Sequence, residues 1–501
     1  METFTWKLEH ELAGVGAGWT DLAGDVLTEY GLSGEDGILS TSPVALLASP
    51  GSLEYTLDNS LSNSGGKYGY YTPNHADCRA GFAKGIRVRY SELYGGVRYF
   101  QNVYWLKEIT PAAGMFTEPV TTCKATDWLD LAMSTPMPSL GVQAGQTADQ
   151  LLTTLLEPLA VQPAAVDFET GDSTFETAFD RDDVTTDSVY SALARITRSE
   201  FSRIYLQSDT ATGGVLCFEN RNFRPGNVTS LGTISNTMDG VDIVDDAGEK
   251  NDLTKVSITP RYVGPSNVVL ASLNYYLLLG PGEERPIELS YRDPNGGNRL
   301  SGKSIVTPAA GDGYVKFGST ADGTASDLNA SLAITVTTAG GNNWKGTVKN
   351  NGAGSGYVNL FQIRGLPVYT YDDYTVTAGT PGLRVLNFDM PYQSNILVAD
   401  SVCFYLQSIT GDNTRRGAVV KIHANKSAAL MLASMTGGIS SRWTLAETQT
   451  ALGGDWFVNG RRWKISLGNR KDMEWYVVPA SADALWILGT SALDVNTRLG
   501  V

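Results

Sequence analysis

The start of the chain alternates apolar and polar side chains, with Phe4, Trp6 and Leu8 separated by polar residues. A period of two is typical of a strand with one buried face. Further apolar runs with strand spacing follow at Leu53–Leu57, Ile86–Tyr90 and Val103–Ile109. The pattern predicts a β-barrel or sandwich over residues 1–120.

Helical spacing appears only in the second quarter of the chain. The sequence predicts a short helix capped by Asp127, a second helix after the capping box Thr147–Gln150, and a third capped by Asp187. A hairpin is predicted from Ile204 to Phe218, across a polar segment that ends in glycine. Residues 121–258 are therefore expected to form an α+β domain.

The composition then shifts to Gly, Asn, Thr and Ser. Strands are predicted at Ala333–Val336 and Tyr357–Ile363, with turns starting at Asp293 and Ala339. Short strands between such turns predict an all-β sandwich, inserted as an arm over residues 259–382.

Hairpin patterns return over residues 383–501, which are predicted to form a β-rich domain that completes the body of the protein. The pair Asn459-Gly460 lies between apolar runs and predicts a type I′ turn, because both residue types tolerate positive φ. Two more strands are expected at Met473–Val478 and Leu485–Leu488. The fold class predicted for the whole chain is mainly β and multidomain.

Length and charge agree with a large soluble protein. The 501 residues are enough for three or four domains, and the formal net charge is −15. No run of Lys and Arg is longer than two residues, as in the pairs Arg415-Arg416 and Arg461-Arg462. Stable nucleic-acid binding is therefore not expected. The acidic surplus either keeps the protein soluble or lines a passage through which DNA moves without sticking.

Cysteine and histidine spacing gives no sign of a metal site or a disulfide framework. The four cysteines, Cys78, Cys123, Cys217 and Cys403, are far apart, and the chain has three histidines. The longest apolar stretches, such as Tyr275–Leu279, are far shorter than the roughly 20 residues of a membrane span. No membrane insertion and no secretion signal are expected, so the protein is expected to be made in the cytoplasm.

Sequence motifs of enzymes are missing. Gly14–Gly18 resembles a phosphate loop, but Trp19 replaces the last glycine of that motif, which predicts a loop between strands. Acid pairs could serve a glycosidase, which needs two carboxylates about 5–10 Å apart. Each pair lies near a predicted turn, where acids are usually solvated; the pairs are Asp182-Asp183, Asp245-Asp246 and Asp372-Asp373.

Two further polar features have structural explanations. The acidic run Asp180–Asp187 lacks the glycine and the final glutamate of a calcium loop. His423 lies in an apparent strand without a metal-ligand partner at the usual spacing, which favours a packed histidine. We therefore expect no enzyme activity, and no catalytic, cofactor-binding or metal-binding residue is assigned.

Several segments, in this order, resemble the tail-tip or baseplate hub (minor tail) proteins of long-tailed double-stranded-DNA phages. They are Trp19–Leu27, Leu53–Ser60, the glycine-tyrosine loop Asn63–Pro73, Gly81–Arg89, Ala125–Leu131, Ser191–Glu200, Glu219–Arg221, Tyr357–Gly365, Trp486–Gly489 and Thr497–Gly500. None of them is catalytic, so the resemblance lies in their order and co-occurrence.

The resemblance implies a virion protein at the tail tip. A hub of this kind forms a ring, usually a homotrimer, around or across the DNA channel. Its partners would be the distal tail protein, the C-terminus of the tape-measure protein, and tip or fibre proteins.

Two other functions stay open from the sequence. A carbohydrate- or receptor-binding module is suggested by aromatic residues of the insert that look exposed: Trp344, Tyr357, Tyr369, Tyr371 and Tyr374. A glycosidase on a β scaffold is the third hypothesis. The chain ends on the hub pattern, which argues against lytic or receptor-binding extensions.

Overall fold

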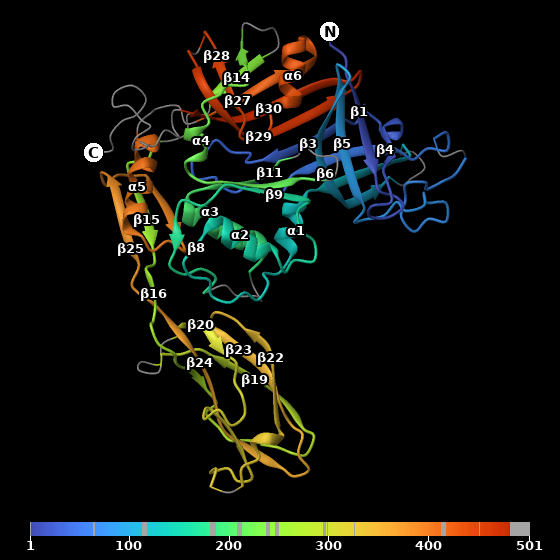
Figure 1. The fold of residues 1–501 in the computed structure, drawn as a ribbon. Coiled ribbons are helices and arrows are strands. Elements are labelled where there is room, and N and C mark those ends of the chain that lie inside the picture. Colours follow the sequence, from blue (N-terminus) through green and yellow to red (C-terminus); the bar gives the residue numbers. More distant parts are fainter. Residues whose placement is uncertain are drawn as a thin grey trace.

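The computed structural model divides the protein into a body and a projecting arm (Figure 1). It describes residues 2–63, 66–112, 118–180, 187–207, 213–236, 241–245, 250–293, 297, 299–324, 326–411, 417–449 and 451–480.

One large sheet joins the two ends of the chain. Its strands follow the order β14-β27-β30-β29-β3-β4-β7-β6-β5-β1-β2, with β28 beside β29 and β13 beside β28. This is an open path, so the strands described here form no closed barrel. The bounds are β1 Thr5–His10, β2 Thr20–Asp21, β3 Leu32–Gly37, β4 Ser52–Asp58, β5 Arg87–Tyr94, β6 Val97–Pro111, β7 Val120–Thr126, β13 Thr233–Ser235, β14 Val241–Asp245, β27 Ala418–His423, β28 Arg442–Ala446, β29 Gly453–Ser466 and β30 Arg470–Pro479.

The sheet packs around a shared apolar core to which both chain ends contribute. Leu8 and Tyr90 from the N-terminal strands lie in the same cluster as Trp463 and Trp475 from the C-terminal strands. Tyr90 stacks on Trp463 with ring centroids 4.4 Å apart. Short helices flank the sheet: η1 Ala23–Asp25, η3 Ala424–Lys426 and α6 Ala428–Thr436.

A second core belongs to the α+β unit below this sheet. Helices α2 and α3 pack together, and α1 packs on α3, over strands β9, β11 and β12. The capping box predicted at Thr147 is confirmed, and β11 and β12 form the predicted hairpin. The bounds are α1 Trp128–Ser134, β8 Gln146–Thr147, α2 Ala148–Leu156, β9 Ala165–Phe168, β10 Thr174–Phe175, α3 Val189–Glu200, β11 Arg203–Gln207, β12 Val215–Glu219 and α4 Phe223–Gly226.

A small third layer links the body to the arm. Helix α5 (Ile396–Thr410) covers a three-stranded sheet of β15 (Leu253–Ile258), β25 (Tyr374–Gly379) and β26 (Val385–Met390). Its strands alternate buried and exposed residues, because one face packs on α5 and the other faces water.

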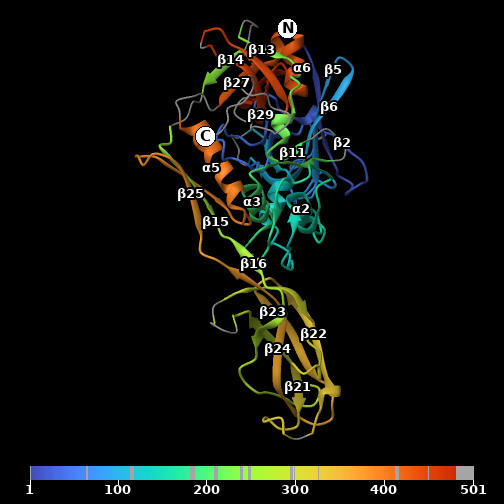
Figure 2. The ribbon, with the colours of Figure 1, turned by 60° about the vertical axis from the view of Figure 1, so that its left-hand side comes forward.

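The arm hangs from this layer on β16 and the end of β24, as Figure 2 shows from a second side. Strand β24 pairs with β16, β17, β18, β20 and β21, and a second sheet holds β19, β23 and β22. Trp344 fills the core between them. The bounds are β16 Arg261–Val263, β17 Val268–Ser272, β18 Leu277–Leu279, β19 Glu284–Ser290, β20 Ser301–Val306, β21 Val315–Gly318, η2 Asn329–Ser331, β22 Leu332–Ala339, β23 Asn343–Asn350 and β24 Gly356–Thr370.

The mainly β, multidomain fold class is confirmed, whereas two local predictions are wrong. Asn459-Gly460 is not a turn: β29 runs through it with a bulge against β30. The turn lies at Gly468-Asn469, where both residues have positive φ. Helix α3 is capped by Ser188, while Asp187 pairs with Arg195.

Some of the other predictions cannot be compared with the structure, because they concern residues that it does not describe or the independent folding of domains. The strand predicted at Leu485–Leu488 lies outside the described residues, as does Asp182-Asp183. Strand β25 falls within the range predicted for the insert but pairs with β15 in the body layer. The four predicted domain ranges stay a prediction about independent folding.

Candidate functional site: a cleft above buried ion pairs

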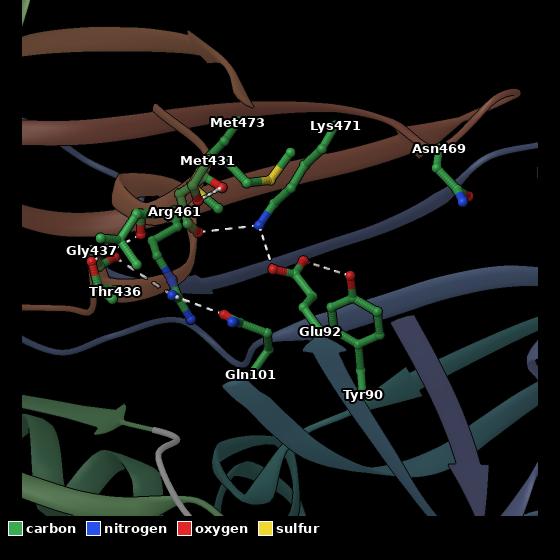
Figure 3. A network of polar contacts seen from close by, with 12 residues as sticks. Tyr90, Glu92, Gln101, Met431, Thr436, Gly437, Arg461, Asn469, Lys471 and Met473 are labelled. Atoms are coloured by element: carbon green, nitrogen blue, oxygen red, sulfur yellow. Dashed lines mark hydrogen bonds and ion pairs between the residues drawn. The ribbon is translucent and has the colours of Figure 1, made fainter. Parts of the chain in front are cut away.

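The body contains ion pairs that lie almost completely out of water. Lys471 of β30 donates to Glu92 of β5 at 2.6 Å, with side chains 0% and 1% exposed (Figure 3). The Tyr90 hydroxyl donates to the other carboxylate oxygen at 2.6 Å, and Lys471 also donates to the carbonyl of Ser434 at 3.1 Å. Burial lowers the pKa of Lys471 below its ordinary value, while the Glu92 charge opposes that shift.

A second pair fixes the neighbouring strands. Arg461 of β29 faces Asp36 of β3 across the ladder and binds it through two hydrogen bonds of 2.8 and 2.7 Å. The same guanidinium donates to the Gln101 side-chain oxygen at 3.2 Å. Two parallel bonds fix direction as well as distance, so this pair aligns β3 with β29.

A third pair joins the α+β unit to the large sheet. Arg224 of α4 donates to Glu219 at 3.2 Å and to the side chain of Asn459 at 2.7 Å. Tyr205 donates its hydroxyl to Glu219 at 2.7 Å. Asn459 is therefore buried and bound inside the body, which explains why it does not form the turn predicted from its sequence.

A cleft opens above the second pair, between β6, the end of β11 and the segment after α6. Its volume is about 290 Å³. Arg461 and Gln101 line its floor, and the walls carry aromatic and aliphatic side chains. The lining residues are Arg98, Tyr99, Phe100, Gln101, Leu206, Gln207, Met435, Thr436, Gly438, Ile439 and Arg461.

Two arginines share one carboxylate at the rim. Arg89 and Arg98 both pair with Glu9, and both guanidiniums lie over the ring of Phe100, at 5.1 and 4.6 Å. Among the ion pairs described around the cleft, Arg89 and Arg98 share the single carboxylate of Glu9, and Arg98 reaches the rim, so the rim favours a further acceptor group.

The buried pairs of this site fix distant segments of the chain relative to one another. Among the residues that the structure describes, no group of three or more His, Cys, Asp or Glu is placed to hold a metal ion. His10 is buried, and burial lowers its pKa to about 3, so it stays neutral and bonds the Tyr55 hydroxyl at 2.6 Å. The four cysteines are all described and are free thiols.

The residues singled out from sequence do not meet at one place. Gly14–Gly18 is the loop between β1 and β2, as predicted. Asp373 is exposed and accepts a hydrogen bond from Thr259, and Asp246 lies outside the described residues. His423 lies in β27 and pairs with Asp472 at 2.7 Å, so an acidic partner does exist.

The aromatic residues of the insert divide between core and surface. Trp344 is fully buried, so the prediction that it is exposed is wrong: an inward position of β23 places it in the arm core. Tyr371 and Tyr374 are exposed. The sequence did not single out Glu92, Asp36 or Gln101. Asp36 lies at an inward position of an alternating strand, whereas Glu92 and Gln101 lie in continuous buried runs of β5 and β6.

No helix within the described residues is long and apolar enough to cross a membrane. The chain matches no family model and no curated protein.

Three solved structures that resemble the chain are tail proteins. A tail protein from Neisseria meningitidis shares 9% identity over 95% of this chain and 96% of its own, with a TM-score of 0.46. A 43 kDa prophage tail protein from Shewanella oneidensis shares 10% identity over 95% and 99%, with a TM-score of 0.47. A prophage tail protein from Listeria monocytogenes shares 7% identity over 94% of each chain, with a TM-score of 0.42. Each of these three likenesses has an identity of 10% or less and a TM-score below 0.5.

Proposed function

We propose that this chain is a structural subunit of a phage tail, located at the tail tip or baseplate hub. It joins the distal tail ring to the tip and surrounds or closes the DNA channel. The names of the solved structures that resemble it suggest a tail protein, and the segments quoted from the sequence suggest the hub position.

The outward face of α5 supports a role in assembly, because it exposes apolar side chains. Leu397 and Phe404 lie seven residues apart on this helix, 72% and 48% exposed. The opposite face packs on the sheet of β15, β25 and β26. An apolar stripe that the described part of the chain leaves uncovered is typical of a protein contact.

The proposed assembly is a homotrimeric ring formed by the domains that flank the arm. Permanent interfaces of this kind bury more than roughly 2,000 Å² and are apolar. The outer partners proposed are the distal tail protein, the C-terminus of the tape-measure protein, and tip or fibre proteins. DNA passes without stable binding, so the face toward the ring axis is expected to be neutral or negative.

The mass of the full chain in solution tests this assembly. We expect a trimer that survives dilution, and a shift toward monomer when Leu397→Ser and Phe404→Ser are combined. Leu467→Ser is the control, because Leu467 is equally exposed, at 72%, in the turn between β29 and β30. A monomer at high concentration that is also absent from purified tails would overturn the proposal.

We also propose that the chain is not an enzyme. Incubating the full chain with host cell-wall polysaccharide is expected to release no reducing sugar. Release that is abolished by Asp373→Asn, or by another single acid substitution, would favour the glycosidase hypothesis instead.

A second candidate function, glycan or receptor binding, is favoured by one observation on the arm. Tyr275 and Tyr276 are adjacent and exposed beside β18. Exposed tyrosines combine an apolar ring with a hydroxyl and suit a sugar surface. Binding of the full chain to a glycan array, lost in the double Tyr→Ala variant and kept in Tyr68→Ala, would support this role.

A further inference from the structure

The floor of the cleft holds a polar atom that has no hydrogen-bond partner among the residues that the structure describes. Gln101 is 3% exposed, and its side-chain oxygen accepts from Arg461. Its side-chain nitrogen has no hydrogen-bond acceptor. A buried N–H without an acceptor is costly, and native structures normally satisfy such groups. The nitrogen is buried beside the cleft, so an acceptor that enters next to Arg98 reaches it when the Gln101 side chain turns outward.

The charge around the cleft selects the kind of acceptor. Arg461 is matched by Asp36, whereas Arg98, which is partly exposed at the rim, shares the carboxylate of Glu9 with Arg89. A carboxylate fits this arginine better than a neutral group. A nucleic-acid strand fits poorly, because its affinity needs several phosphate contacts to basic side chains.

The walls and the volume select a side chain rather than a large ligand. Phe100, Leu206, Met435 and Ile439 present apolar surface around the polar floor. About 290 Å³ is at the lower end of ligand pockets, which start at roughly 300 Å³. The space accepts one or two side chains of an extended segment.

We propose that the cleft between β6, β11 and α6 binds an acidic peptide segment of a neighbouring protein. One carboxylate of the segment lies toward Arg98 and Gln101, and an adjacent apolar side chain packs on Met435 and Ile439. That the neighbour is another tail protein rests on the proposed function, whereas the chemistry of the peptide rests on the cleft alone.

A methyl NMR titration of the full chain tests the site. The probes are two blocked tripeptides, leucine-aspartate-leucine and leucine-asparagine-leucine, added to protein with labelled methionine methyl groups. Met435 lines the cleft, and Met133, exposed on α1, is the internal control. We expect the Met435 signal to shift, the Met133 signal to stay, and the aspartate peptide to bind about fivefold more tightly, as befits a half-exposed charge pair.

Two variants identify the groups that bind the carboxylate. Arg98→Gln removes the rim charge while Arg89 stays paired with Glu9, so the preference for aspartate should disappear without unfolding. Gln101→Met should weaken both peptides. Arg285→Gln, at an exposed arginine of the arm, is the matched control and should change neither affinity.

Several results would overturn the inference. They are equal affinity for the two peptides, no shift at Met435, an equal response to a short single-stranded oligonucleotide, or a Met435 shift on dilution alone, which would identify a second copy as the occupant. Peptide binding by a chain that is absent from purified tails would instead refute the proposed function and leave the cleft assignment standing.

Discussion

Replacing Glu92 by glutamine tests whether buried charge pairing holds the two ends of the chain together. The change removes the charge that faces Lys471 but keeps an acceptor for the Tyr90 hydroxyl. Lys471 is 0% exposed, so its ammonium group would be left in the core without a facing charge, donating to the Ser434 carbonyl. Removing one member of such a pair typically costs about 3–5 kcal/mol.

This cost is large enough to measure by calorimetry. For a unit of this size, about 3 kcal/mol corresponds to a fall of about 6–12 °C in the unfolding temperature of the sheet body. The arm has its own core, so its transition should not move. Hydrogen exchange in β5 and β30 should rise together, because the pair joins these strands.

The double variant Glu92→Gln with Lys471→Met separates charge from packing. It removes both charges and keeps the acceptor for Tyr90, so most of the lost stability should return. The single variant should also recover as the pH rises toward 10, because burial lowers the pKa of Lys471 and its neutral form tolerates the core. Glu54→Gln, whose partner Lys124 is at the surface, is the control and should cost less than about 1 kcal/mol. A single variant as stable as the parent, or a double variant no better than the single, would refute the reasoning.

Three further predictions concern other buried groups. Burial raises the pKa of Glu200 from 4.5 to about 7, so the folded state holds its proton to higher pH than the unfolded state; its contribution to stability should fall between about pH 4.5 and 7, and urea titrations of Glu200→Gln should lack that part of the pH dependence. Asp180 pairs with Arg261 at 3.0 Å where the arm meets the body, so Asp180→Asn should widen the distribution of arm positions in small-angle scattering, and an unchanged profile would contradict this. Trp344→Ala should cost about 3–5 kcal/mol and make the arm, but not the body, sensitive to limited proteolysis.

Local patterns predicted much of the secondary structure because strand alternation and helix caps depend on neighbouring residues. The strand at the N-terminus, the capping box at Thr147 and the hairpin of β11 and β12 are confirmed on that basis. The failure at Asn459-Gly460 has a tertiary cause. The Asn459 side chain accepts from Arg224, 235 positions earlier in the chain, and this buried bond outweighs the local preference for a turn.

The candidate site was beyond sequence analysis for a related reason. Glu92 and Lys471 are 379 positions apart, and neither lies in a motif. Gln101 is followed by Asn102 in a strand of mixed polar and apolar residues, so nothing in the sequence marks it. Only the folded chain, in which β6, β11 and α6 surround Gln101, shows that its side-chain nitrogen lacks an acceptor among the described residues. Trp344 shows the opposite error, since a residue type that suits a surface site turned out to fill a core.

The three buried pairs described above bear on how the body assembles. Two of them link β29 or β30 to a segment far away in the chain, Arg461 to Asp36 and Lys471 to Glu92. The third, Arg224 with Glu219, is local, and a hydrogen bond from Arg224 to Asn459 ties it to β29. A slip of one residue in either strand would turn these groups toward apolar neighbours and leave buried charges without partners, at several kcal/mol each. Apolar residues at these positions would give similar stability, but their contacts are not directional and would specify the partner strand less sharply than paired charges do. The charges therefore act chiefly on alignment, so that the cleft and the α5 face keep one relative geometry, which a subunit with several simultaneous contacts needs.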